Sequence, residues 1–341
     1  MKVFCFGEIL LRISPALNEE WIRRSLMEVF VGGSELNVAT ALTRWNIPVA
    51  YCSALPKNYL SDEICQSLSK QGIDISRMIF SGDRIGIYYL PQGLDLKHAG
   101  VIYDRAHSSF GALKPGTIDW NKMLDGMDWF HFSAITPALN AGLALLCGEA
   151  LAVASDRKMK ISVDLNFRSK LWQYGQNPKD IMPSLVSHCD LIMGNIWSAN
   201  SLLGIPVDEK IHERKSREVY LEQAQQTAET IREQYPKSGK VAQTFRLEGE
   251  EGLVYYAYLD WEGKSYASQT FYPIVIDRVG TGDCFMGGMI YGINKFHEPQ
   301  RIIDFATAAA CGKFSEKGDV THQRIEDVEA ILKNNIRSST H

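Results

Sequence analysis

The sequence predicts an α/β protein with a central, mostly parallel sheet flanked by helices and a small β-sheet lid. Short β-rich apolar runs alternate along the chain with segments whose apolar residues recur at three- and four-residue steps. Such alternation is typical of a parallel sheet that is covered on both faces. Two other segments lack a helix between their strand-like runs and contain turn residues such as Pro91-Gln92-Gly93. They indicate a second, separate set of strands.

Composition sets the class of protein. The 341 residues correspond to about two domains, or to one large α/β domain with an addition. A hydrophobic fraction of 45% and a charged fraction of 22% exclude a disordered or low-complexity protein. The 36 Lys and Arg residues against 40 Asp and Glu leave a net charge of −4 and no basic field for phosphate backbones or anionic lipid. We therefore expect no nucleic-acid partner and no membrane partner.

The apolar stretches and the cysteines predict the compartment. The amino-terminal apolar run is interrupted by Glu8 and Arg12 and is too short for a secretory segment. The most apolar later stretch, Ala141 to Ala154, is shorter than the roughly 20 residues that a membrane crossing needs. The seven cysteines are scattered, form no Cys-x-x-Cys pair and are expected to be reduced core residues. We expect a cytoplasmic protein.

The predicted elements follow from these patterns in chain order. The strands of the main sheet are expected at Val3 to Ile9, Val49 to Ala54, Trp129 to Ser133, Ile161 to Leu165 and Leu191 to Met193. Helices are expected at Ser34 to Trp45, Asp62 to Gln71, Ala138 to Arg157, Pro178 to His188, Glu218 to Tyr235, Cys284 to Phe296, Pro299 to Ser315 and Ile325 to Asn335. Residues 1–12, 32–83 and 107–341 are assigned to the α/β core. Residues 13–31 and 84–106 are assigned to the lid, as antiparallel additions that could exclude water from a group-transfer site.

The strongest local motif is at residues 277–283, which read Asp-Arg-Val-Gly-Thr-Gly-Asp. It follows the apolar run Tyr272 to Ile276 and precedes a helical pattern, so we expect a strand, a glycine turn and a helix. Gly280 and Gly282 let backbone N–H groups converge on an anion, and the helix N-terminus adds partial positive charge. A carboxylate at Asp283 could then accept a proton from an attacking hydroxyl. By itself, the motif also fits a capped helix start.

Other polar positions suit a small polyol or sugar acid. Gly32-Gly33 precedes a helix that carries Asn37, and such a turn lets a polyol lie against the backbone while Asn37 exchanges hydrogen bonds. After a predicted strand, three polar residues share one face by alternation: Asp164, Asn166 and Arg168. They fall at the edge where open α/β sheets bind ligands.

The predicted lid strands carry tyrosines and an arginine, namely Tyr88, Tyr89, Tyr103 and Arg105. The pair of Arg105 and Arg168 suits a small carboxylate, because guanidinium binds planar oxyanions bidentately. Cross-strand pairing or a dimer contact would also explain aromatic and basic residues on an exposed sheet.

Taken together in chain order, these motifs resemble the ribokinase-like, or PfkB, family of carbohydrate kinases. The resemblance rests on Gly32-Gly33 with Asn37, on Asp164-x-Asn166-x-Arg168 with Leu171-Trp172, and on the motif that ends at Asp283. Within the family, the 2-keto-3-deoxygluconate kinases are the most similar group. The resemblance implies a Rossmann-like core with a β lid, ATP and Mg²⁺, and transfer of the γ-phosphoryl group to a sugar hydroxyl. It also implies a homo-oligomer joined through the lid, a dimer or higher, and leaves an activating monovalent cation open.

The same resemblance implies roles for individual residues. Asp283 matches the family's catalytic base, and Gly280, Thr281 and Gly282 match its anion hole. The positions that match sugar-acid contacts are Gly33, Asn37, Tyr89, Tyr103, Arg105 and Arg168. Asn195, with Gly280 and Gly282, falls in the nucleotide-binding region. No metal ligand is assigned.

Three departures from the family pattern stand out. Ser198 replaces the acid of an Asn-x-x-Glu motif that helps to organise Mg²⁺. Residues 244–252 replace the Thr-x-Gly-x-x-Gly nucleotide loop, so adenine contacts cannot be transferred. Thr281 stands where Ala is common, which preserves the backbone donors.

The leading hypothesis is an ATP-dependent kinase that phosphorylates a hydroxyl of 2-keto-3-deoxygluconate or a closely related sugar acid. A neutral sugar such as fructose or ribose, or a nucleoside, is the alternative acceptor. Ser198 also motivates a sugar-responsive binding protein whose catalysis has decayed, although the intact Asp283 argues against it. A nicotinamide-dependent dehydrogenase is disfavoured because no Gly-x-Gly-x-x-Gly follows the first strand.

Overall fold

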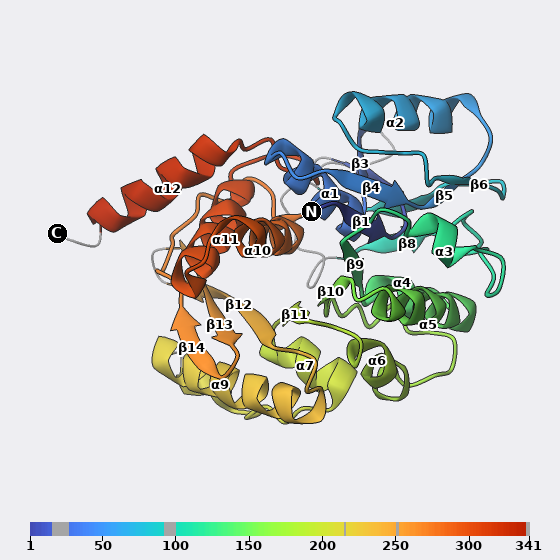
Figure 1. The fold of residues 1–341 in the computed structure, drawn as a ribbon. Helices are drawn as coiled ribbons and strands as arrows, with labels where there is room; N and C mark the ends of the chain where they lie inside the picture. The colour runs from blue at the N-terminus through green and yellow to red at the C-terminus, as the bar shows by residue number, and fades with distance from the viewer. Residues whose placement is uncertain (16–26, 92–99, 215, 250–251, 339–341) are drawn as a thin grey trace.

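The computed structural model describes residues 1–15, 27–91, 100–214, 216–249 and 252–338. Its main sheet has eight strands in the order β14-β13-β12-β11-β10-β9-β1-β4 (Figure 1). Their bounds are β1 Val3–Phe6, β4 Val49–Cys52, β9 Trp129–Ser133, β10 Lys160–Asp164, β11 Leu191–Gly194, β12 Lys240–Gly249, β13 Gly252–Trp261 and β14 Lys264–Ala267. The strands from β4 to β12 pair in parallel, whereas β13 and β14 are antiparallel. The predicted mostly parallel sheet is confirmed.

Helices cover both faces of this sheet (Figure 1). One face packs against α3 Trp120–Met123, α4 Ile135–Leu139, α5 Ala141–Asp156, α6 Pro178–Val186, α7 Ile196–Leu203, α8 Ile211–Arg214 and α9 Arg217–Gln234. The other packs against α1 Ser34–Arg44, α2 Tyr59–Lys70, α10 Thr281–Lys295, α11 Pro299–Phe314 and α12 Ile325–Ser338. Strand alternation divides the core in this way: in β1, Phe4 and Phe6 face the first layer, and Val3 and Cys5 face the second.

A second sheet of four strands stands beside the main one, in the order β3-β2-β7-β8. Its strands are β2 Leu10–Ser14, β3 Glu28–Gly32, β7 Gly86–Tyr89 and β8 Ile102–Asp104. β2 begins before the predicted lid segment, and it pairs with β7 in parallel rather than antiparallel. The predicted lid residues 16–26 and 92–99, including most of the Pro91-Gln92-Gly93 turn, lie outside the described residues. The division into core and lid stays a prediction.

One row of side chains crosses this second sheet and ties it to the core. Phe30, Arg12, Tyr88 and Tyr103 are register partners on the four neighbouring strands. The Arg12 guanidinium lies 4.5 Å from the centroid of the Phe30 ring and forms a buried ion pair of 2.7 Å with Asp277. The second sheet is therefore anchored at the start of the 277–283 motif. A short third sheet pairs β5 Ala54–Leu55 with β6 Ile79–Phe80.

Two predicted elements are wrong, and both errors have a local cause. The expected helix from Ala138 to Arg157 is divided into α4 and α5 at Asn140, whose extended backbone and side-chain oxygen cap the N–H group of Leu143 at 2.9 Å. The expected strand from Tyr272 to Ile276 pairs with no strand of a sheet and has no regular secondary structure. Pro273 lacks a backbone donor, and the N–H group of Ile276 binds the carbonyl oxygen of Phe314 at the end of α11 instead.

The seven cysteines are buried and free, as expected for reduced core residues. Among the described residues, no helix combines the length and the apolar character that crossing a membrane demands.

Candidate active site

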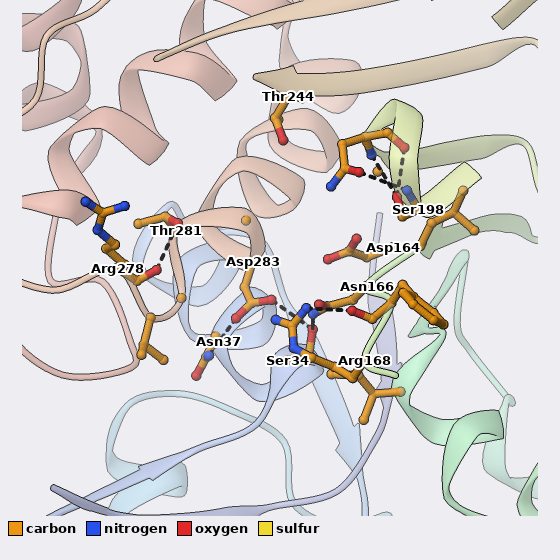
Figure 2. A pocket seen from close by; sticks show the side chains of 18 of the residues that line it. Ser34, Asn37, Asp164, Asn166, Arg168, Ser198, Thr244, Arg278, Thr281 and Asp283 are labelled. Carbon is orange, nitrogen blue, oxygen red and sulfur yellow. Dashed lines mark hydrogen bonds between the residues drawn. The ribbon is translucent and has the colours of Figure 1, made fainter. Parts of the chain in front are cut away.

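A cavity of about 670 Å³ opens where β10, β11 and β12 end at the same edge of the main sheet (Figure 2). Open α/β sheets bind ligands at this edge. The first turns of α1 and α10 and the inner side of the second sheet complete the wall. The predicted site residues that line it are Gly33, Asn37, Tyr103, Arg105, Arg168, Asn195, Gly280, Thr281, Gly282 and Asp283. Segments that are far apart in the sequence thus share one cavity.

Asp283 lies in the first turn of α10 and is 7% exposed. Both of its oxygens accept hydrogen bonds from neutral side chains: Oδ1 from the Ser34 hydroxyl at 2.8 Å and Oδ2 from Asn37 Nδ2 at 2.7 Å (Figure 2). Burial raises the pKa of Asp283 to about 6, although the two hydrogen bonds and the positive charge of Arg168 oppose the rise. A carboxylate with this pKa is ionised at neutral pH and basic enough to take a proton.

The glycine turn before α10 is fixed by a close approach of two chain segments. Gly280 has φ 78°, and a Cβ there would lie 1.9 Å from the carbonyl oxygen of Asp319. Glycine is therefore required at this position. The turn opens a helix of 15 residues whose first N–H groups have no partner within the helix. These donors and the helix dipole can bind an anion beside Asp283.

A second glycine and a buried side chain hold α1 against the core. Gly33 has φ 145°, and a Cβ there would lie 2.2 Å from the carbonyl oxygen of Glu8. Glu35, in the first turn of α1, accepts a hydrogen bond of 2.8 Å from the backbone N–H of Ser133. This bond joins α1 to the end of β9. Asn37 uses its amide nitrogen on Asp283, and its Oδ1 is buried with no hydrogen-bond partner among the described residues.

The two predicted arginines differ in their surroundings. Arg168 follows β10, lines the cavity and donates to the backbone carbonyl of Phe167 at 3.0 Å. Arg105 also lines the cavity, but it is buried and paired with Glu8, whose other oxygen accepts from the Ser108 hydroxyl. The charge of Arg105 is thus neutralised within the protein.

The predicted tyrosine contacts are divided by strand alternation. Tyr103 lines the cavity, whereas Tyr89 is absent from its lining and the neighbouring Tyr88 takes that place. Successive residues of a strand point to opposite faces, which separates Tyr88 from Tyr89. The Tyr88 hydroxyl donates to Asp319 Oδ2 at 2.9 Å. Of this pair, Tyr88 thus lies on the cavity side, and a contact of Tyr89 with the sugar acid stays a prediction.

The far end of the cavity is formed by α7 and the long strand β12. Asn195 and Ser198 cap α7 reciprocally: each side chain accepts the backbone N–H of the other residue at 2.9 Å. Alternate residues of β12 line the wall, namely Thr244, Arg246 and Glu248. Arg278 closes this end through a hydrogen bond of 2.7 Å to Glu248.

Several lining residues were not among the predicted site residues. Ser34 is one of them, and its position directly after Gly32-Gly33 is the sequence signal that points to it. The β12 side chains gave no signal, because nothing in the sequence shows that this strand continues past the sheet edge to the cavity.

Carboxylates suited to Mg²⁺ are few in the cavity. Asp164, at the end of β10, is 5% exposed and lines the wall between Asp283 and Ser198 in Figure 2. The described residues contain no group of three or more His, Cys, Asp or Glu side chains that could hold a metal on their own. This donor set fits an ion that binds one or two carboxylates together with substrate phosphates and water, as Mg²⁺ does.

Comparisons with known proteins agree with this geometry. The sequence matches the pfkB family of carbohydrate kinases over residues 1–324. It is 26% identical over 332 residues to a 2-dehydro-3-deoxygalactonokinase of Haloferax volcanii, which covers 97% of this chain and 96% of the relative. It is 24% identical over 322 residues to a 2-dehydro-3-deoxygluconokinase of Thermoproteus tenax, with 94% and 90% covered.

A solved structure extends the likeness to the fold. The 2-dehydro-3-deoxygluconokinase of Thermotoga maritima matches with a TM-score of 0.88 and 34% identity, and the match covers 98% of each chain. The predicted family and fold class are confirmed. Because the family match includes the main sheet, the second sheet and the glycine turn at Asp283, the chain belongs to the pfkB family of carbohydrate kinases, phosphotransferases that use ATP with Mg²⁺.

Proposed function

We propose that the protein is an ATP-dependent kinase of 2-keto-3-deoxygluconate or a closely related six-carbon sugar acid. The observation that carries the proposal is Asp283: a buried carboxylate with a raised pKa, held by neutral donors beside the free N–H groups of a glycine turn. The names of the Haloferax, Thermoproteus and Thermotoga relatives support a keto-deoxy sugar acid as the acceptor.

In the proposed reaction, a primary hydroxyl of the sugar attacks the γ-phosphorus of ATP. The new oxygen–phosphorus bond forms as the bond to the β,γ-bridging oxygen breaks and ADP leaves. Asp283 takes the hydroxyl proton, and the backbone N–H groups after Gly280 stabilise charge on the transferring group. Most of the rate enhancement comes from positioning and electrostatic stabilisation, as in other phosphoryl transfers.

The acceptor half of the cavity lies between α1, the residues after β10 and the second sheet. The unpartnered Oδ1 of Asn37 is an acceptor for a substrate hydroxyl. Arg168 supplies a guanidinium for the substrate carboxylate, and Tyr103 and Gly33 border the same space. Because Glu8 already neutralises Arg105, we assign that arginine to holding β8 and the cavity wall rather than to a full ion pair with the substrate.

The nucleotide half lies toward α7 and β12. Thr244 and Arg246 of β12, together with Arg278, offer a hydroxyl and positive charge where the family's glycine-rich loop is absent. We propose that they bind the triphosphate, along with Asn195 and the glycine turn. Asp164 would hold Mg²⁺, which neutralises phosphate charge when it is bound. Ser198 is occupied in capping α7, so Asn195 has a defined position without the missing acid.

We also propose that the second sheet acts as the lid and joins two or more subunits in the cytoplasm. Its outer side carries Val29, which is 54% exposed, and Ile102, which is 52% exposed. Apolar side chains exposed on a sheet are typical of a surface that is covered in an oligomer. Sedimentation of the purified chain tests this arrangement, and a monomer at micromolar concentration would contradict it.

The acceptor is tested by measuring ATP consumption with a panel of sugars. The panel contains 2-keto-3-deoxygluconate, its C4 epimer 2-keto-3-deoxygalactonate, fructose, ribose and a nucleoside. We expect the highest kcat/KM for a keto-deoxy sugar acid. A higher kcat/KM for fructose or ribose would contradict the sugar acid as acceptor and indicate a neutral sugar instead. The pairing of Arg105 with Glu8 favours this alternative.

A further inference from the structure

A fully buried lysine lies directly behind the glycine turn. Lys313, in the last turn of α11, is 0% exposed. Its ammonium donates to two backbone carbonyls of the following loop, those of Gly318 at 2.8 Å and Glu316 at 3.1 Å. Among the described residues, no carboxylate lies within 4.0 Å of it in an ion pair. Burial lowers the pKa of Lys313, and the nearby carboxylates of Asp277, Glu316 and Asp319 oppose that fall and favour the charged ammonium.

The loop that Lys313 holds touches the turn at its tightest point. The carbonyl oxygen of Asp319 occupies the space beside Gly280, and the Lys313 Cε would lie 3.3 Å from a Cβ at that glycine. Asp277 accepts a hydrogen bond of 3.2 Å from the backbone N–H of Gly318. This bond joins the loop to the other side of the turn. The backbone position of Gly280 therefore depends on the path of residues 316–319.

Charge explains why a cation is needed here. Two carboxylates, Asp277 and Asp319, are buried behind a turn whose N–H groups face the cavity. Arg12 pairs with both, at 2.7 Å to Asp277 Oδ2 and at 2.7 Å to Asp319 Oδ1, and balances one of the two negative charges. Lys313 balances the other. Without it, an uncompensated negative charge would stand behind the site where a polyphosphate must bind.

We propose that Lys313 is a tethered monovalent cation: its ammonium takes the place that a free potassium-sized ion would fill between the carbonyls of Glu316 and Gly318. Backbone carbonyls are the ligands that such ions use in proteins. Lys313 is a positioning residue, since it acts on the glycine turn through the 316–319 loop. The chain therefore carries its own cation at this place and needs no free monovalent ion there. The catalytic part of the inference rests on the proposed function.

The test compares the wild-type chain, Lys313→Ala and Lys313→Met in tetramethylammonium, potassium and ammonium chloride at equal ionic strength. We expect wild-type kcat to be the same in all three salts. Lys313→Ala leaves an ion-sized space, and its kcat in tetramethylammonium should fall about 10²-fold, as when an oxyanion-hole donor is lost. Potassium or ammonium should restore most of that loss. Lys313→Met fills the space with an apolar chain and should lose kcat without being restored.

A matched control is Lys317→Ala. Lys317 belongs to the same loop, but its ammonium pairs with Glu28 at the surface, and exposed pairs contribute little. We expect its kcat to equal that of the wild type in every salt. A readout that needs no turnover is the melting temperature, which should rise with potassium in Lys313→Ala and stay constant in the wild type.

Three results would overturn the proposal. They are activation of the wild-type chain by potassium, full kcat of Lys313→Ala in tetramethylammonium, and a folded Lys313→Ala that potassium changes in neither kcat nor melting temperature. If Lys313→Ala does not fold, the wild-type salt series and Lys313→Met still decide. If the wild type shows no sugar-dependent ATP turnover, the proposed function fails, while the melting temperatures test the cation position independently.

Discussion

Asp277 and Asp283 stand at the two ends of one glycine turn, and their surroundings are opposite. Both are buried. Asp277 pairs with Arg12 and accepts the N–H groups of Val279 and Gly318, so charged and backbone donors hold both of its oxygens. Asp283 accepts only neutral side-chain donors in the described contacts, from Ser34 and Asn37, and faces the cavity.

The difference separates a carboxylate that fixes structure from one whose surroundings suit the proposed role of a base. A buried carboxylate that pairs with a buried arginine is held as an anion and contributes to a fixed geometry. A buried carboxylate with neutral donors keeps a raised pKa and can exchange a proton. Asp277 and Asp283 lie six positions apart on one turn. We therefore expect substitution of Asp283 to lower turnover and substitution of Asp277 to lower stability.

The largest expected effect is on turnover at Asp283. Asp283→Asn keeps the size of the side chain but removes the proton acceptor, so kcat should fall by about 10²- to 10⁴-fold. An ATP-consumption assay measures it, and circular dichroism checks that the fold is retained. Equal turnover of the two proteins would remove Asp283 from the role of base.

At Asp277 the expected effect is on stability. Asp277→Asn leaves the buried Arg12 with one carboxylate partner instead of two, and the free energy of unfolding should fall by about 3 kcal/mol. Urea denaturation at neutral pH measures this. A variant of unchanged stability would show that Asp319 alone is a sufficient partner for Arg12, and would weaken the contrast with Asp283.

The pKa of Asp283 predicts a pH profile for the free enzyme. A base works in its deprotonated form, and burial raises the pKa of Asp283 to about 6. Below that pH, kcat/KM should fall about tenfold per pH unit, and above it the profile should level off. Ser34→Ala removes a hydrogen bond that favours the carboxylate, so the pKa and the acidic limb should move to higher pH.

A second buried acid makes a control for this profile. Burial raises the pKa of Glu35 to about 7, although hydrogen bonds from Ser133 oppose the rise. Because Glu35 is absent from the cavity lining, Glu35→Gln should leave the limb near pH 6 in place. Loss of that limb in Glu35→Gln would assign it to Glu35 rather than to Asp283.

The smallest expected effect concerns the substrate carboxylate at Arg168. Arg168→Lys keeps the charge but loses the bidentate geometry of guanidinium, so KM for the sugar acid should rise about tenfold while KM for ATP is unchanged. The two KM values are measured in the same assay. Equal KM values for sugar acid in the two proteins would mean that the carboxylate is bound elsewhere.

The sequence alone was enough for the class of fold and for the proposal of Asp283 as the base. Strand runs with helical periods between them determine a covered parallel sheet, and the turn at Gly280 requires glycine because of its backbone conformation. Asp283 follows from the same local pattern. These are properties of short segments, which neighbouring residues specify.

Tertiary structure decided which side chains meet. Sequence periodicity could not distinguish Tyr88 from Tyr89 at the cavity, because the face that a strand buries depends on what packs against it. It could not show that Glu8 neutralises Arg105 across 97 positions, or that Lys313 places its charge behind Gly280. Such pairings depend on contacts between distant segments, and only the assembled fold brings those segments within a few ångströms.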